Sequence, residues 1–126
     1  MACKPWMGAI KEPTYPYYND KKNGHKPPNV TIEVEYVHGY RTKDMRNNLY
    51  LLPDGKILYN AAALGIVLDP EANTQTFFTK HEDDITALDL SPDRMYAASG
   101  ELGPKPNIFL WNVDTKEVKC NFRAPL

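Results

Sequence analysis

The chain has 126 residues, of which 42% are hydrophobic and 25% charged, a composition that fits one small globular domain rather than a disordered chain. Its 15 basic and 16 acidic residues leave a formal net charge of -1, which excludes a chain-wide electrostatic footprint for nucleic acid or an anionic lipid surface. No apolar run approaches the roughly 20 residues that span a bilayer, and the N-terminus lacks the apolar segment of a secretory signal. We therefore expect a cytoplasmic protein that neither enters a membrane nor binds nucleic acid.

The first region, residues 1–29, is rich in proline and tyrosine and is predicted to be an extended arm. It nevertheless carries Trp6, Met7 and Ile10, and apolar groups of this kind in a polar arm usually anchor it to a surface. Two surfaces are open for this anchor, namely the chain's own domain and a partner.

The second region, residues 30–50, begins with a stretch that alternates apolar and polar side chains. This alternation over residues 30–37 predicts a strand with one buried face. A polar loop follows over residues 38–48, with three cations and one anion among residues 41–46. A lone leading strand of a propeller commonly completes the outer edge of the last blade, and here that blade is absent from the sequence.

The remaining residues form two successive units of four short strands with the same turn signals, a first unit over residues 48–80 and a second over 81–126. The expected strands are residues 49–52, 56–60, 65–69 and 74–78 in the first unit, and 85–90, 94–99, 108–112 and 117–122 in the second. The Pro-Asp pairs at 53–54 and 92–93 lie 39 positions apart. A repeat of roughly 40 residues with four strands is the period of a WD-repeat blade. The predicted fold is therefore all-β, a partial atypical β-propeller, because two blades cannot close a ring.

Residues 33–41, with the sequence EVEYVHGYR, resemble the HELP motif of the echinoderm microtubule-associated protein-like family. The resemblance covers nearly the whole chain and continues through residues 4–10, 61–67, 76–85, 98–100 and 106–111. The positions that carry the motif and the blade pattern are Gly39, Tyr40, Arg41, Arg46, Asn48, Tyr50, His81 and Trp111. The resemblance implies a tandem atypical propeller that binds microtubules or soluble tubulin, in the cytoskeleton and in cilia or flagella. Members of the family carry many more blades, so we expect this chain to be a fragment.

The second unit departs from the ordinary WD repeat in the residues of its internal hydrogen-bond network. In that repeat a histidine and an aspartate six residues before the tryptophan join a network across the blade. Here His81 and Trp111 are present, but Lys105 stands at the aspartate's position and Asn112 replaces the terminal aspartate. The sequence therefore predicts an incomplete network in which His81 is structural rather than catalytic.

The sequence favours a non-catalytic protein without cofactor or metal. It contains no His-x-x-x-His, Cys-x-x-Cys, Gly-x-Ser-x-Gly or Gly-x-x-x-x-Gly-Lys motif. The acidic run at residues 82–84 is interpreted as a solvated turn between blades, since consecutive acidic residues rarely converge on one cation. Cys3 and Cys120 are too few for a disulfide framework.

The basic residues of the loop suggest a contact with tubulin, whose outer surface and tails are strongly acidic. We expect Lys43 and Arg46 to make this contact, whereas Gly39, Tyr40 and Arg41 are expected to fix the loop, with Arg41 donating to backbone carbonyls. The competing interpretation is a generic propeller scaffold that recruits other proteins without touching tubulin. Open strand edges add self-association, or association with other propeller segments, to the expected partners.

Overall fold

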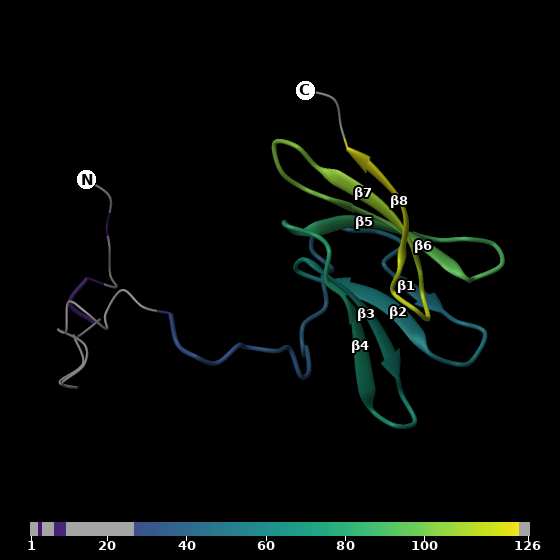
Figure 1. Ribbon diagram of the computed structural model, residues 1–126, viewed down its shortest axis with the longest axis horizontal. Helices are drawn as coiled ribbons and strands as arrows, with labels where there is room; N and C mark the ends of the chain where they lie inside the picture. Colours follow the sequence, from purple (N-terminus) through teal and green to yellow (C-terminus); the bar gives the residue numbers. More distant parts are fainter. Residues whose placement is uncertain (1–2, 4–6, 10–26, 124–126) are drawn as a thin grey trace. The chain divides into compact units, whose positions relative to one another are not determined.

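The computed structural model describes residues 3, 7–9 and 27–123, and the chain divides into two units, Met1–Glu33 and Val34–Leu126. Among the described residues of the first unit, 7–9 form a turn in which Gly8 has a φ of 104°. The described part of the second unit is all-β, with eight strands and no helix (Figure 1). No helix in the described residues could therefore cross a membrane.

The first blade is a four-stranded antiparallel sheet with the strands in chain order. Its strands are β1 (Leu49–Leu51), β2 (Ile57–Ala61), β3 (Leu64–Asp69) and β4 (Thr74–Phe78). Tight turns join them, and Gly55 supplies a φ of 84° between β1 and β2. The β3–β4 turn begins at Asp69, whose carboxylate accepts hydrogen bonds from the backbone N–H groups of Glu71 and Ala72.

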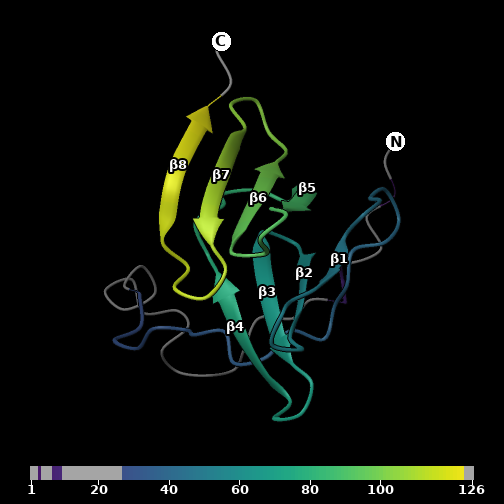
Figure 2. The ribbon, with the colours of Figure 1, turned by 90° about the vertical axis from the view of Figure 1, so that its right-hand side faces the viewer.

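The second blade repeats this plan. Its strands are β5 (Ile85–Leu90), β6 (Tyr96–Glu101), β7 (Asn107–Asn112) and β8 (Val118–Arg123), again antiparallel and in chain order. Figure 2 shows the two sheets with β4 and β8 at one side and β1 and β5 at the other. Two consecutive sheets of the same strand order are the repeat of a β-propeller, so the unit Val34–Leu126 is a partial propeller.

The expected strands agree with the observed ones to within about two residues, and β4 and β5 have the predicted bounds. The largest displacement is in β6, which begins at Tyr96 rather than at residue 94. The turn is longer than the sequence suggested because Arg94 adopts a φ of 59° and its N–H bonds to the carbonyl of Ser91. The strand can begin only after this turn has closed.

The structure departs from the sequence expectation at residues 30–37, which lie outside any strand. Val30 and Ile32 are 72% and 96% exposed, and Val37 at the end of the stretch packs against the first blade, so the buried face expected along the whole stretch does not form. The physical reason is that a strand needs a neighbouring ladder, and none of the described strands pairs with these residues. The alternating pattern is typical of a strand, but within the described part of the chain these residues pair with no other strand.

The main core lies between the two blades. Leu58, Val67 and Phe78 of the first blade face Phe109 and Trp111 of the second in one buried cluster. The Phe78 and Trp111 rings are stacked with centroids 4.3 Å apart and an interplanar angle of 3°. Both side chains are almost completely buried, so this pair contributes a large part of the hydrophobic stabilisation between blades.

A smaller core covers the other face of the first blade. Tyr59, Ala61 and Ile66 form it, and Val37 packs against it from the segment that precedes β1. We call residues 38–48, which continue from Val37 into β1, the motif loop. The motif loop thus begins on the face of the first blade that points away from the second blade.

Candidate functional site

Arg41 is the central residue of the motif loop. Its Nε and Nη2 atoms donate to the two carboxylate oxygens of Asp44 at 2.8 and 2.7 Å, and its Nη1 donates to Asp84 at 2.7 Å. These hydrogen bonds, first the one with Asp44 and then the one with Asp84, raise the pKa of Arg41, and the bond from Arg41 lowers the pKa of Asp44. The partners are carboxylates rather than the backbone carbonyls expected from the sequence. Arg41 therefore links the loop to the turn that opens the second blade.

The loop backbone is fixed by Asn48, which is buried. Its amide nitrogen donates to the carbonyl of Arg41, and its amide oxygen accepts from the Tyr40 hydroxyl at 2.5 Å. The N–H of Arg41 also reaches the carbonyl of Asn60 in β2 at 3.4 Å. The two ends of the loop are thereby held together and against the first blade.

Two further side chains connect the first blade to the second. Asn60 is fully buried and donates through Nδ2 to the carbonyl of Ile85 at 3.0 Å. The Tyr50 hydroxyl donates to the carbonyl of Leu88 at 3.0 Å, and burial followed by the nearby Asp89 carboxylate raises the pKa of Tyr50. These bonds place a motif residue, Tyr50, at the seam between blades.

Gly39 needs no glycine-specific conformation. A Cβ added there would meet its nearest atom, the Cβ of Ala61, at 3.9 Å, which is an ordinary van der Waals distance. Its place in the motif therefore has no steric explanation in the described part of the chain.

Lys43 and Arg46 are the exposed cations of the motif loop. They flank Met45, which is only 8% exposed and belongs to the core between the blades. Neither cation forms an ion pair with a described residue. The buried methionine anchors the loop while the two charges on either side remain accessible to solvent.

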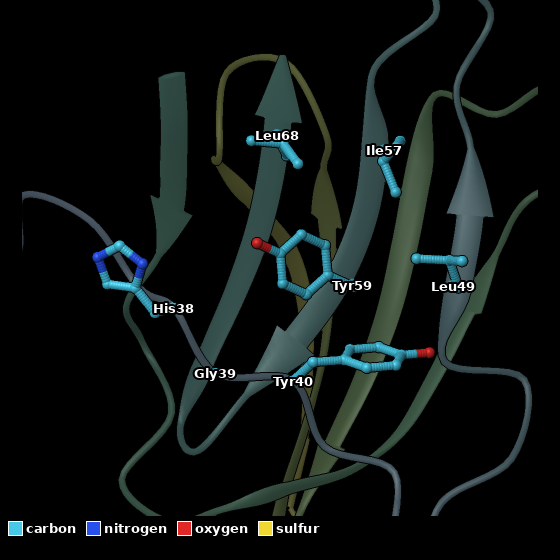
Figure 3. Close-up of a pocket in the computed structure, with 7 residues that line it drawn as sticks. All are labelled: His38, Gly39, Tyr40, Leu49, Ile57, Tyr59 and Leu68. Atoms are coloured by element: carbon cyan, nitrogen blue, oxygen red, sulfur yellow. The ribbon is translucent and has the colours of Figure 1, made fainter. Parts of the chain in front are cut away.

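The motif loop also forms one wall of an apolar groove of about 210 Å³ on the outer face of the first blade (Figure 3). His38, Gly39 and Tyr40 supply this wall. Leu49, Ile57, Tyr59 and Leu68 supply the remaining surface from β1, β2 and β3. The Tyr40 ring meets the Tyr59 ring edge to face, with centroids 5.8 Å apart. Burial raises the pKa of Tyr59, whose hydroxyl accepts from Gln75 at 2.8 Å.

His81 lies in a buried hydrogen-bond network of the second blade. Its Nδ1 is 2.8 Å from Oε2 of Glu101 and its Nε2 is 2.6 Å from the hydroxyl of Ser99. Trp111 donates through Nε1 to the same hydroxyl at 3.0 Å. Because the carboxylate can only accept, Nδ1 carries the proton and Nε2 accepts from Ser99.

The charge state of this network follows from burial and hydrogen bonding. Burial lowers the pKa of His81 and outweighs the opposing hydrogen bond to Glu101, so the imidazole is neutral at pH 7. Burial alone would raise the pKa of Glu101. Bonds from His81 and from the backbone N–H groups of Glu82 and Asn107 instead lower it to about 2. The network therefore holds one fixed negative charge on Glu101.

The sequence predicted that this network would be incomplete, and that prediction was wrong. Glu101, which the sequence reasoning missed, supplies the carboxylate that completes it. Lys105, which stands at the usual aspartate position, is exposed. Glu101, at the end of β6, supplies the carboxylate instead, with its Oε2 atom 2.8 Å from Nδ1 of His81. The sequence feature that could have identified Glu101 as the partner of His81 is its position as an acidic residue at the start of the β6–β7 connection.

The remaining sequence candidates are the anchor residues of the arm, the acidic run and the two cysteines. Met7 is 64% exposed in the turn at 7–9, whereas Trp6 and Ile10 fall outside the described residues. In the acidic run, Asp84 pairs with Arg41. No group of three or more potential metal ligands occurs among residues 27–123 or the short described stretches before them. Cys3 and Cys120 are both free and exposed.

Comparison with known proteins places these features in context. The model of the HELP motif matches residues 27–66. The ciliary WD repeat-containing protein ctxp80 of Euplotoides octocarinatus is 37% identical over 98% of this chain and 19% of its own length. The 77 kDa echinoderm microtubule-associated protein of Strongylocentrotus purpuratus is 35% identical over 74% of this chain and 14% of its own length.

Human echinoderm microtubule-associated protein-like 1 is 39% identical over 60% of this chain and 9% of its own length. The chain therefore spans a fifth or less of these relatives. Among solved structures, a chain of the crystal structure of the mitotic checkpoint complex aligns with 76% of this chain and 34% of its own, at a TM-score of 0.46 and 7% identity.

Proposed function

We propose that this chain, which belongs to the echinoderm microtubule-associated protein-like family, is a non-catalytic cytoskeletal protein that contacts tubulin through its motif loop. Its relatives are named as microtubule-associated proteins and one as a ciliary protein. The cellular setting that we infer from them is the microtubule cytoskeleton, including that of cilia or flagella.

The observation that carries the proposal is the pair of exposed cations, Lys43 and Arg46, on either side of buried Met45. The anchored methionine limits the freedom of the loop, so less conformational entropy is lost when the two charges meet a partner. Acidic surfaces such as those of tubulin attract this pair, and the attraction weakens with added salt.

Arg41 is proposed to have a different role. Its guanidinium already bonds two carboxylates and its side chain is only 11% exposed, so it is not available to a partner. We assign Tyr40, Arg41 and Asn48 to the shape of the loop, and Lys43 and Arg46 to the contact.

The test is co-sedimentation of the full 126-residue chain with polymerised microtubules at low and at physiological salt. The double variant Lys43→Glu and Arg46→Glu should bind roughly thirtyfold more weakly, because two attractions of about 0.5 kcal/mol each become repulsions of similar size. The matched control is Lys80→Glu with Lys105→Glu, since both lysines are exposed and the change in net charge is the same.

The outcomes separate three cases. Weaker binding of the loop variant with an unchanged control supports the proposed contact. Equal losses in both variants indicate attraction to net charge alone and reject it. A wild-type chain that fails to pellet at low salt rejects the proposal for this chain.

A second candidate function is a protein-interaction scaffold without direct tubulin contact, and the apolar groove beside the motif loop favours it. If a protein partner binds in this groove, the substitution Leu49→Glu should abolish the binding of that partner to the chain. The loop variant should leave that binding unchanged.

A further inference from the structure

The segment that leads into the motif loop is attached to the first blade by a side chain rather than by a strand ladder. The backbone N–H of Val37 donates to Oε1 of Gln75 at 2.7 Å, and Nε2 of Gln75 donates to the carbonyl of Val37 at 2.9 Å. A carboxamide presents the same donor and acceptor as a peptide group. Gln75 therefore gives Val37 the two hydrogen bonds that a residue of a neighbouring antiparallel strand would have given.

The orientation of the Gln75 amide is fixed by these partners. A backbone N–H can only donate and a carbonyl can only accept, so Oε1 has to face the N–H group and Nε2 the carbonyl. Nε2 also donates to the Tyr59 hydroxyl at 2.8 Å. Gln75 is half-buried on β4 and bonds through both ends of its amide, so its side chain has little freedom to turn.

Val37 is the point from which the chain crosses the first blade. Gln75 holds Val37 at β4, and three residues later the Tyr40 ring meets the ring of Tyr59 in β2. Figure 3 shows the chain passing beside Tyr59 on its way to Tyr40. The chain runs across the strands and not along one of them, so it cannot form a ladder. Gln75 therefore fixes the place at which the crossing begins.

The segment has a second bond to the same hairpin, and this bond is weaker. The Tyr36 hydroxyl donates to Oδ1 of Asn73 in the β3–β4 turn at 2.9 Å, at an exposed position. Water can replace an exposed hydrogen bond at little cost. Without the amide of Gln75, by contrast, the N–H and the carbonyl of half-buried Val37 would both lose their partner.

We propose that Gln75 is a positioning residue of the motif loop: it sets the point at which the loop leaves the first blade and thereby directs Lys43 and Arg46 toward a partner. The effect on the partner rests on the proposed tubulin contact, whereas the positioning of the loop does not. Asn48 holds the far end of the loop and Gln75 holds the near end through Val37. With both ends fixed, the loop loses less conformational entropy when it binds.

The first test is hydrogen exchange of individual backbone amides, followed by NMR on the full chain. Gln75→Met keeps the length of the side chain but removes its donors and its acceptor. It should speed exchange of the Val37 amide at least about tenfold and leave the amides of β3 unchanged. Thr74→Ala is the matched control, because Thr74 is the exposed neighbour of Gln75 on β4 and its side chain points to the other face of the sheet.

Gln75→Glu separates the hydrogen bonds from the packing of the side chain. At pH 7 the introduced carboxylate has no donor for the carbonyl of Val37, and residues 37–41 should exchange faster than in wild type at the same pH. Partial burial beside a carbonyl raises the pKa of this carboxylate, so at pH 5 it is protonated and can donate again. Protection relative to wild type should then return in Gln75→Glu but not in Gln75→Met.

Three exchange results would overturn the positioning role of Gln75. They are an unchanged rate at Val37 in Gln75→Met, an equal increase in the loop and in β3, and a Gln75→Glu variant that matches Gln75→Met at pH 5. An equal increase would mean that the variant destabilises the whole blade.

Co-sedimentation with microtubules tests the effect on the partner. Gln75→Met retains Lys43 and Arg46, yet it should bind about threefold more weakly than wild type, because its loop is no longer held at both ends. Equal binding of the two proteins overturns this effect. A wild type that fails to pellet rejects the tubulin contact, while the exchange rates still decide whether Gln75 positions the loop.

Discussion

The buried network of the second blade makes a quantitative prediction about pH. Glu101 has a pKa of about 2 in the folded chain against an ordinary value of 4.5. At about 1.36 kcal/mol for each pKa unit, this difference corresponds to about 3 kcal/mol of folding free energy. Because the folded pKa is lowered, that stabilisation is present above about pH 4.5 and is lost as the pH falls toward 2. A loss of this size is a large fraction of the stability of a small domain.

His81 acts in the same direction over a higher range. Its pKa is lowered by burial from the ordinary value of 6.5, so the unfolded chain takes up a proton before the folded chain does. The free energy of unfolding should therefore decrease as the pH falls below 6.5. It should then decrease further below about pH 4.5 as Glu101 begins to contribute.

The perturbation that isolates the carboxylate is Glu101→Gln. The amide keeps the size of the side chain, but its NH₂ group would face donors from His81 or from Asn107, where the carboxylate now accepts. We expect a loss of about 2–4 kcal/mol at pH 7, from the bonds to the charged group and the donors left without partners. The pH dependence between 4.5 and 2 should also become flatter.

The assay is urea denaturation followed by tryptophan fluorescence at several pH values. Glu71→Gln, on an exposed turn residue, is the control for removing one negative charge. If Glu101→Gln matched the control at pH 7, or lost stability as steeply as wild type below pH 4.5, the reasoning about the network would be refuted.

Four further substitutions test the packing between the blades and the motif loop. Phe78→Ala removes the ring stacked on Trp111 and should cost about 3–5 kcal/mol in urea unfolding. Gly65→Ala would bring a Cβ to 3.0 Å from the Trp111 ring and should cost about 1–3 kcal/mol, whereas Gly39→Ala should change the urea midpoint little. Arg41→Lys should speed hydrogen exchange in the motif loop, because lysine cannot bond both carboxylates with a planar fork, and unchanged exchange would contradict the linking role of Arg41.

The strands were predictable from the sequence because their signals are local. Each short apolar run is bounded by turn residues, and the bounds of β4 and β5 follow from those residues alone. The loop between Ser91 and Tyr96 was harder to predict, since the left-handed conformation of Arg94 is uncommon for a residue with a side chain.

Features that depend on distant partners were not predictable in the same way. Residues 30–37 have the alternation of a strand but no neighbouring ladder among the described residues. The pairing of Arg41 with Asp84 joins positions 43 apart, and no local pattern connects them. Glu101 was missed because the usual spacing directs attention to Lys105, although the network requires only a carboxylate within reach of His81.

The motif loop separates its cations into two kinds, and this separation makes the binding proposal testable without unfolding the chain. Arg41 is neutralised by two carboxylates and connects the loop to the second blade. Lys43 and Arg46 form no ion pair with a described residue, and Met45 between them supplies the anchorage. Reversing these two charges therefore removes attraction to a partner while the bonds of Arg41 and the burial of Met45 stay in place. A binding defect in that variant with an unchanged urea midpoint would then reflect the contact itself and not the fold.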